Sequence, residues 1–301
     1  MGKVVVYAIG GNALSDPKGS DNNSDDVLES VIDDVIDLLE ADWRVVLTHG
    51  NGPQVGHLMS LDSKNSEPMD SWVAATQGMI GHSLALKLDS RLKSRNRPER
   101  SAVVLTRVEV DTRDEGFNNP QKPVGPVLKD DAIIPLDWTT KHTEHGKRRV
   151  VASPLPVSIV DTALIEKLVG LRAVVICGGG GGIPVSIEDG KIKGVEAVVD
   201  KDRLSALLAI SLKADALVIS TGIDSVKLNF GKENEQSLDS ISVELALRYL
   251  EEGHFPAGSM APKIGSLIEA VSHVPSMVAI LCSPGEAVSS LRGESGTLIQ
   301  R

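Results

Sequence analysis

The sequence predicts an α/β fold in which helices sandwich an open, mainly parallel sheet, with a small subdomain inserted near the middle. Short β-branched runs alternate with longer segments that have helical spacing. Aromatic residues are only 3% of the 301 residues, so Val, Ile, Leu and Ala must form the core, as is typical of parallel sheets covered by helices. A break in the alternation over residues 111–156 predicts the insertion.

The apolar runs predict one buried sheet. Between the first two runs, apolar residues recur at helical spacing from Ser24 to Ala41, with Ser24 as the candidate N-cap. A strand, a helix and a strand in this order imply a right-handed crossover and parallel pairing. The predicted strands are Val4–Ile9, Val45–Thr48, Val103–Leu105, Ala173–Cys177, Leu217–Ser220 and Val278–Leu281.

The insertion at residues 111–156 holds six prolines, a charged stretch at 141–149 and little periodicity. We expect it to form a lid with a small core of its own rather than a flexible linker. The rest of the chain shows no second break, so residues 1–301 are predicted to be one domain with an N-terminal half, 1–170, and a C-terminal half, 171–301. The candidate core residues of the insertion are Val124, Ile133, Ile134, Leu136 and Trp138.

Composition excludes several classes of protein. The formal net charge of −10 argues against a general nucleic-acid binder, which needs a surplus of basic residues. Cys177 and Cys282 lie in apolar runs, which favours buried reduced thiols over a disulfide or a metal site. The first residues enter a predicted strand directly, and no apolar run has membrane-spanning length. We therefore expect a cytoplasmic protein without a membrane partner.

Three glycine-rich segments each follow a predicted strand. In an open α/β sheet such loops lie at the carboxyl ends of the strands, where backbone N–H groups and helix N-termini bind anions. One such loop is more often a simple tight turn, but three of them, two with an asparagine, favour a phosphate site. The P-loop and dinucleotide-binding spacings are absent, so a different phosphate-handling fold is required. The segments are Gly10–Leu14, His49–Gly56 and Gly178–Pro184.

These segments resemble the signatures of the carbamate kinases, within the amino-acid-kinase superfamily. Matching segments continue through nearly all of the chain. Where relatives carry Thr-Asp-Val and then a tyrosine, this chain has Thr221-Gly222-Ile223 and Lys227, which leaves its nucleotide preference open. The further matching segments are Gln77–Gly81, Asn119–Pro126, Arg148–Val151, Gly194–Asp202, Glu252–Lys263 and Gly296–Thr297.

The resemblance implies reversible phosphoryl transfer between ATP and carbamate, giving ADP and carbamoyl phosphate, with Mg²⁺ accompanying the nucleotide. It places the small substrate on the N-terminal half and the nucleotide on the C-terminal half, in a homodimer. The residues it implies for the small substrate are Gly10, Gly11, Asn12, Gly50, Asn51 and Gly52. Those it implies for the nucleotide are Gly179, Gly180, Asp200, Asp202, Thr221 and Lys263.

Three lysines have contexts suited to phosphoryl transfer, which depends mainly on alignment and charge neutralisation. Lys122 lies in the insertion, Lys201 lies between two aspartates, and Lys263 lies in the first turn of a predicted helix. Each taken alone could be a surface lysine. The resemblance implies that all three are catalytic and surround the transferred phosphate.

The sequence shows no general base and no cluster of metal ligands. Carbamate is already an anionic nucleophile, so its kinase needs no general base, whereas a kinase for alcohols usually requires one. We expect His49 to order its loop and His82 to face the core or an interface. The apolar residues of Gln77–Leu92 exceed what one helix face needs, which favours dimerisation through this helix.

Two alternatives remain at this stage. The first is a kinase of another small carboxylate, such as an amino acid or its acetylated form, which would need a larger pocket. The second is a nucleotide- or metabolite-sensing protein that lost turnover through the change at Gly222. Retention of Lys122, Lys201 and Lys263 argues against the second.

Overall fold

The structure is a computed structural model that describes residues 2–10, 22–62, 67–129, 134–136, 138–143, 146–231, 233–256 and 258–301. Two of the predicted substrate-binding residues, Gly11 and Asn12, lie outside the described residues, as does Ile133 of the predicted insertion core.

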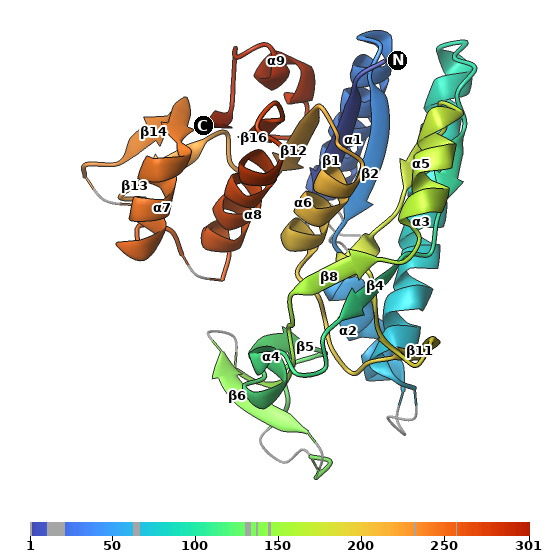
Figure 1. The fold of residues 1–301 in the computed structure, drawn as a ribbon, viewed down its shortest axis with the longest axis vertical. Helices are drawn as coiled ribbons and strands as arrows, with labels where there is room; N and C mark the ends of the chain where they lie inside the picture. Colours follow the sequence, from blue (N-terminus) through green and yellow to red (C-terminus); the bar gives the residue numbers. More distant parts are fainter. Residues whose placement is uncertain are drawn as a thin grey trace.

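An eight-stranded sheet forms the centre of the molecule and confirms the predicted open, mainly parallel sheet (Figure 1). Its strand order is β15-β17-β16-β12-β1-β2-β9-β3, and only the β16–β17 pair is antiparallel. The strands are β1 (Val4–Ile9), β2 (Arg44–His49), β3 (Ser101–Val103), β9 (Val174–Ile176), β12 (Ala216–Ser220), β15 (Ser240–Ser242), β16 (Val278–Cys282) and β17 (Thr297–Gln300).

Helices cover both faces of this sheet. Successive residues of its central strands point to opposite sides, so each strand packs against both layers of helices. Val6 and Ala8 pack toward one layer of helices, whereas Val5 and Tyr7 pack toward the other. The first layer contains α5 (Thr162–Gly170), α6 (Lys201–Ser211), α7 (Val243–Glu251) and α8 (Met260–His273). The second contains α1 (Asn22–Glu40), α3 (Met69–Ser94) and α9 (Ala287–Leu291).

Two local predictions differ from the structure. The run Val103–Leu105 is not a buried strand, because β3 ends at Val103 and lies at the sheet edge with only β9 beside it. Val103 and Leu105 are accordingly 40% and 50% exposed. Helix α1 begins at Asn22, so Ser24 falls inside its first turn rather than at the N-cap.

A second sheet of four strands, which the sequence did not predict, lies beside the first (Figure 1). Its strand order is β11-β10-β4-β8. Strands distant in sequence pair within it: β4 pairs with β10, where Arg107 lies opposite Ile183. Its strands are β4 (Arg107–Val110), β8 (Pro156–Ile159), β10 (Ile183–Glu188) and β11 (Lys191–Gly194), and a separate ribbon joins β13 (Val226–Leu228) to β14 (Gln236–Leu238).

The insertion forms a small three-stranded sheet that projects away from the main sheet (Figure 1). It follows α4 (Glu115–Asn118) and has the order β5 (Lys122–Val124), β7 (Gly146–Val151) and β6 (Thr139–Thr143). Among the described residues of the insertion, the predicted core residues do not pack into a core of their own. Val124 packs with Val55 of helix α2 (Gly52–Leu61) and with residues of α3, while Leu136 is fully exposed.

Candidate functional site

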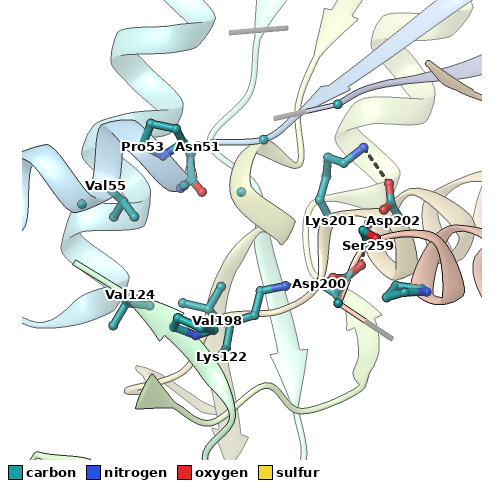
Figure 2. Close-up of a pocket in the computed structure, with 18 of the residues that line it drawn as sticks. Asn51, Pro53, Val55, Lys122, Val124, Val198, Asp200, Lys201, Asp202 and Ser259 are labelled. Atoms are coloured by element: carbon teal, nitrogen blue, oxygen red, sulfur yellow. Dashed lines mark hydrogen bonds and ion pairs between the residues drawn. The ribbon is translucent and has the colours of Figure 1, made fainter. Parts of the chain in front are cut away.

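A cavity of about 1010 Å³ lies at the carboxyl ends of the central strands, between the main sheet and the inserted sheet (Figure 2). All the described residues that the sequence predicted for the site line this cavity, with the exception of Gly179. The predicted residues on its wall are Gly10, Gly50, Asn51, Gly52, Lys122, Gly180, Asp200, Lys201, Asp202, Thr221 and Lys263.

The buried carboxylate of Asp202 holds Lys201 and Lys263 together. The Asp200 side chain caps α6 by accepting a hydrogen bond from the Asp202 backbone N–H at 2.9 Å, so the helix begins with Lys201 and Asp202. Lys201 Nζ lies 2.6 Å from Asp202 Oδ1, and Lys263 Nζ of α8 donates to Asp202 Oδ2 at 2.9 Å. Figure 2 shows Lys201 pointing toward Asp202. Two cations therefore share one carboxylate.

The charges in this cluster shift one another's pKa values. Burial alone would raise the pKa of Asp202, but the ammonium groups of Lys201 and Lys263 outweigh burial and lower it to about 2. Burial, with repulsion from Lys263, lowers the pKa of Lys201 despite the attraction of Asp202. The close Lys201–Asp202 contact is not aligned as a hydrogen bond, so the shielded Lys201 ammonium has donors without a partner among the described residues. Such donors suit a phosphate.

The third lysine reaches the cluster from the inserted sheet. Lys122 Nζ donates to Asp200 Oδ2 at 3.0 Å, and its side chain is 38% exposed. Asp200 thus connects the start of α6 with the insertion. Lys227, by contrast, lies outside the cavity wall, where it pairs with Glu235 at 3.2 Å.

The third glycine segment forms a tight turn against the second. Gly180 has a φ of +65°, and a Cβ placed on it would overlap the Asn51 amide. A side chain at Gly181 would overlap the Val199 carbonyl. Glycine is therefore required for the two loops to meet. Gly179 lies behind the wall, between the His49 ring and the Gln77 side chain, rather than facing the cavity.

Two neighbouring polar residues of α3 support these loops, and sequence reasoning did not identify them as such. Thr76 Oγ1 accepts a hydrogen bond from Asn51 Nδ2 at 2.9 Å. Gln77 donates to the Gly179 carbonyl at 2.9 Å and accepts from the Thr106 N–H at 2.8 Å. Both side chains are buried. The sequence signals were this polar pair within a mainly apolar stretch and the match of Gln77–Gly81 to the family.

Neither His49 nor His82 takes a position suited to acid–base catalysis at the lysine cluster, whereas His57 of α2 is exposed and lines the cavity. His49 is buried, and burial lowers its pKa to about 4, so the ring is neutral at pH 7. The neutral ring donates from Nδ1 to the Gly50 carbonyl at 2.9 Å, which agrees with the expected loop-ordering role. His82 is exposed on α3, which excludes the core position that was one of its two expected places.

Neither a metal-binding cluster nor a membrane-spanning helix is found in the part of the chain that the structure describes. Within the described ranges, no group of three or more His, Cys, Asp or Glu side chains is arranged to hold a metal ion. In the same part of the chain, no helix has both the length and the apolar character needed to cross a membrane.

The glycine loops at the ends of parallel strands, together with three converging lysines, define a phosphate-binding α/β protein. The family model of the amino acid kinase family matches residues 3–279, and the chain belongs to that family. The resemblance noted from the sequence is thereby confirmed.

The similar proteins carry a narrower name. The chain is 40% identical to the carbamate kinase-like protein YahI of Escherichia coli and 39% identical to the carbamate kinase of Pyrococcus furiosus, with 99% of both chains covered in each comparison. Among solved structures, carbamate kinase from Giardia lamblia bound to AMP-PNP has a TM-score of 0.89 and 33% identity, covering 99% of this chain and 98% of the other.

Proposed function

We propose that this chain is a carbamate kinase, which transfers a phosphoryl group reversibly between ATP and carbamate to give ADP and carbamoyl phosphate. The observation that carries the proposal is the convergence of Lys122, Lys201 and Lys263 on one cavity at the carboxyl ends of the central strands. Such a site suits a nucleophile that is already an anion. Full-length similarity to proteins named carbamate kinase supports the same reaction.

The proposed roles follow the two sides of the cavity. Gly10, Gly50, Asn51 and Gly52 bind the small substrate, together with Gly11 and Asn12, which the sequence alone assigns. Lys122, Lys201 and Lys263 neutralise the charge of the transferred phosphoryl group. The nucleotide lies along Gly180, Asp200, Asp202, Thr221 and Lys263, with Gly179 supporting the turn from behind.

The protein carboxylates fit an indirect role toward Mg²⁺ better than direct ligation. Both oxygens of Asp202 face lysines, and Asp200 already serves a backbone N–H and Lys122. Mg²⁺ commonly retains several waters and is held by substrate phosphates. When bound, the ion would neutralise nucleotide charge, while Asp200 and Asp202 hold the lysines in place.

The domain organisation follows from these roles. Residues 1–170 form the small-substrate half and residues 171–301 the nucleotide half of one domain. The insertion, residues 111–156, acts as a lid that carries Lys122 over the cavity and excludes water, to which an acyl phosphate is sensitive.

We also propose a homodimer, in the cytoplasm, assembled through α3. Ile80, Leu84 and Leu88 of this helix are buried in the core, whereas Met79 and Leu86 are 56% and 57% exposed. The exposed pair lies on the side away from the core, and no element of the described residues covers it. Light scattering should give about twice the chain mass of 31.9 kDa, and a monomer at micromolar concentration would contradict the dimer.

A coupled assay that follows ATP formation from ADP and carbamoyl phosphate tests the reaction. Turnover with these substrates is expected. Turnover only with ATP and another small carboxylate would instead identify a related kinase. Nucleotide binding without turnover of any small carboxylate would identify a sensor.

A further inference from the structure

Arg148 and Arg149 are adjacent on β7 but differ in the partners of their guanidinium groups. Arg149 Nη2 donates to Glu196 Oε1 at 2.6 Å, and its guanidinium lies 4.3 Å from the centre of the Trp138 ring. Arg148 lines the cavity, and its Nη2 donates to the Gly125 carbonyl at 2.6 Å. In the part of the chain that the structure describes, Arg148 has no carboxylate partner, and its Nε is shielded from solvent without a hydrogen bond.

An uncompensated guanidinium is unfavourable in such a place. Burial lowers the pKa of Arg148, and no acid among the described residues opposes this shift. A shielded charge normally has a counter-ion or a full set of hydrogen bonds. If Arg148 served only to brace the Gly125 carbonyl, an uncharged donor would be sufficient and would avoid the cost of burying a charge. The cavity wall is where an anionic ligand could supply the missing partner.

The position of Arg148 is fixed where the inserted sheet meets α2. Gly125 has a φ of +68°, and its backbone lies within 3.6 Å of the place a Cβ of Gly56 would occupy. Val55 and Val124 pack together beside this contact, and Figure 2 shows them on the same side of the cavity as Lys122. The insertion therefore contributes two cations to the wall, Lys122, which pairs with Asp200, and Arg148, which pairs with no acid that the structure describes.

We propose that Arg148 is an oxyanion-binding residue that binds the small substrate on the lid side of the cavity. Its planar guanidinium, with an unused Nε–H, matches a carboxylate-like or phosphate group and binds either more directionally than an ammonium does. The inference rests on the proposed function, because it assigns to the same cavity the group that recognises the acid part of its substrate.

The test compares Arg148→Gln with Arg149→Gln. Glutamine at 148 can still donate to the Gly125 carbonyl but carries no charge, and Arg149→Gln removes the neighbouring charge that already has partners. Titration calorimetry with inorganic phosphate and with bicarbonate separates the two anion geometries. Arg148→Gln should weaken binding of at least one anion roughly 10- to 100-fold, as expected for a charge-assisted contact. Arg149→Gln should leave both within about twofold of the parent.

Turnover gives an independent measurement. Arg148→Gln should raise the KM for carbamoyl phosphate by a similar factor and leave the KM for ADP unchanged, whereas a purely structural role would alter both together. Arg148→Lys, which keeps the charge and loses the planar fork, should fall between parent and Arg148→Gln, and it serves as the test variant if Arg148→Gln does not fold.

The inference would be overturned if a folded Arg148→Gln or Arg148→Lys protein matched the parent in its anion affinities and in its KM for carbamoyl phosphate. This holds even if the parent is an active carbamate kinase. Loss of anion binding at Arg148→Gln in a parent that does not turn over carbamoyl phosphate would support the inference and contradict the proposed function. The two failures are thus distinguishable.

Discussion

The cavity receives its cations from two regions that are supported in different ways. Lys201 and Lys263 extend from helices packed on the main sheet, are 11% and 14% exposed at the side chain, and share the buried Asp202. Lys122 extends from a three-stranded sheet whose Val124 packs against α2 and α3, and its side chain is 38% exposed. Groups that stabilise developing charge are most effective when held rigidly before reaction. We therefore expect the positive charges of Lys201 and Lys263 to be held in place before the reaction, and that of Lys122 to move with the insertion.

Removing Lys201 should have the largest effect. Lys201→Ala should lower kcat about 10²–10³-fold with a smaller change in KM, because the lost contact stabilises charge redistributed in the transition state. Lys263→Ala should behave in the same way. Steady-state kinetics test both variants, and a Lys201→Ala protein that keeps more than about a third of parent kcat would remove Lys201 from the mechanism.

Removing Lys122 should reduce activity by less, roughly 10- to 100-fold, as for loss of one charge-assisted hydrogen bond. Its ion pair with Asp200 is partly exposed, so the free energy of unfolding should change by less than about 1 kcal/mol. Kinetics together with urea unfolding of Lys122→Ala test this separation. A large loss of stability would show that the insertion is as firmly integrated as the helices.

The shared carboxylate predicts a dependence of stability on pH. The pKa of Asp202 is lowered to about 2, so its ionised form stabilises the folded state above the ordinary carboxyl range, and this contribution is lost as pH falls toward 2. The loss should amount to about 2 kcal/mol in the parent. Asp202→Asn should lack this component. Unfolding curves between pH 5 and pH 2 that fall in parallel for both proteins would contradict the assignment.

The proposed mobility of the insertion predicts protection by ligands. Trypsin cleavage within residues 111–156 should slow severalfold when ADP and carbamoyl phosphate are saturating, because closure removes the open form that the protease attacks. Cleavage elsewhere in the chain provides the internal control. Unchanged cleavage rates in this segment would show that it is not a lid.

The smallest effect is expected at Lys227. This residue lies outside the cavity wall and pairs with Glu235 and Asp224, so Lys227→Ala should leave kcat near the parent value and change at most the affinity for nucleotide. The KM for ADP and the kcat of this variant provide the measurement. If Lys227→Ala lost as much kcat as Lys201→Ala, the reacting groups would have to lie closer to β13 than the cavity described above.

The sequence was most informative where structure is local. Strands β1, β2, β12 and β16 are continuous apolar runs buried on both sides, so their pattern predicted them. The four-stranded sheet escaped prediction because its short strands depend on distant partners, as Arg107 depends on Ile183. Nothing near β3 marked its run as the edge of the sheet.

The site was predicted unevenly for the same reason. The glycine segments follow strands directly, so their place at one edge of the sheet follows from topology. The meeting of Lys122 with Asp200 is a tertiary contact that was not predicted, although the family resemblance assigned both residues to the site. The contacts of Thr76 with the Asn51 side chain and of Gln77 with the Gly179 carbonyl were not predicted, because they exist only after α3 has packed.

Redesign of the cavity for other acids is constrained by the run at 178–182. A methyl group on any of these five glycines would lie closer than 3.0 Å to a neighbouring atom, so a library that randomises them would consist mostly of misfolded variants. Gly222 and Gly258 line the cavity outside the proposed substrate loops, and a methyl group on either would meet no atom of the described residues within 4 Å. Engineered substrate scope is therefore best sought at those two positions, where side chains can be added without disturbing the turn behind them.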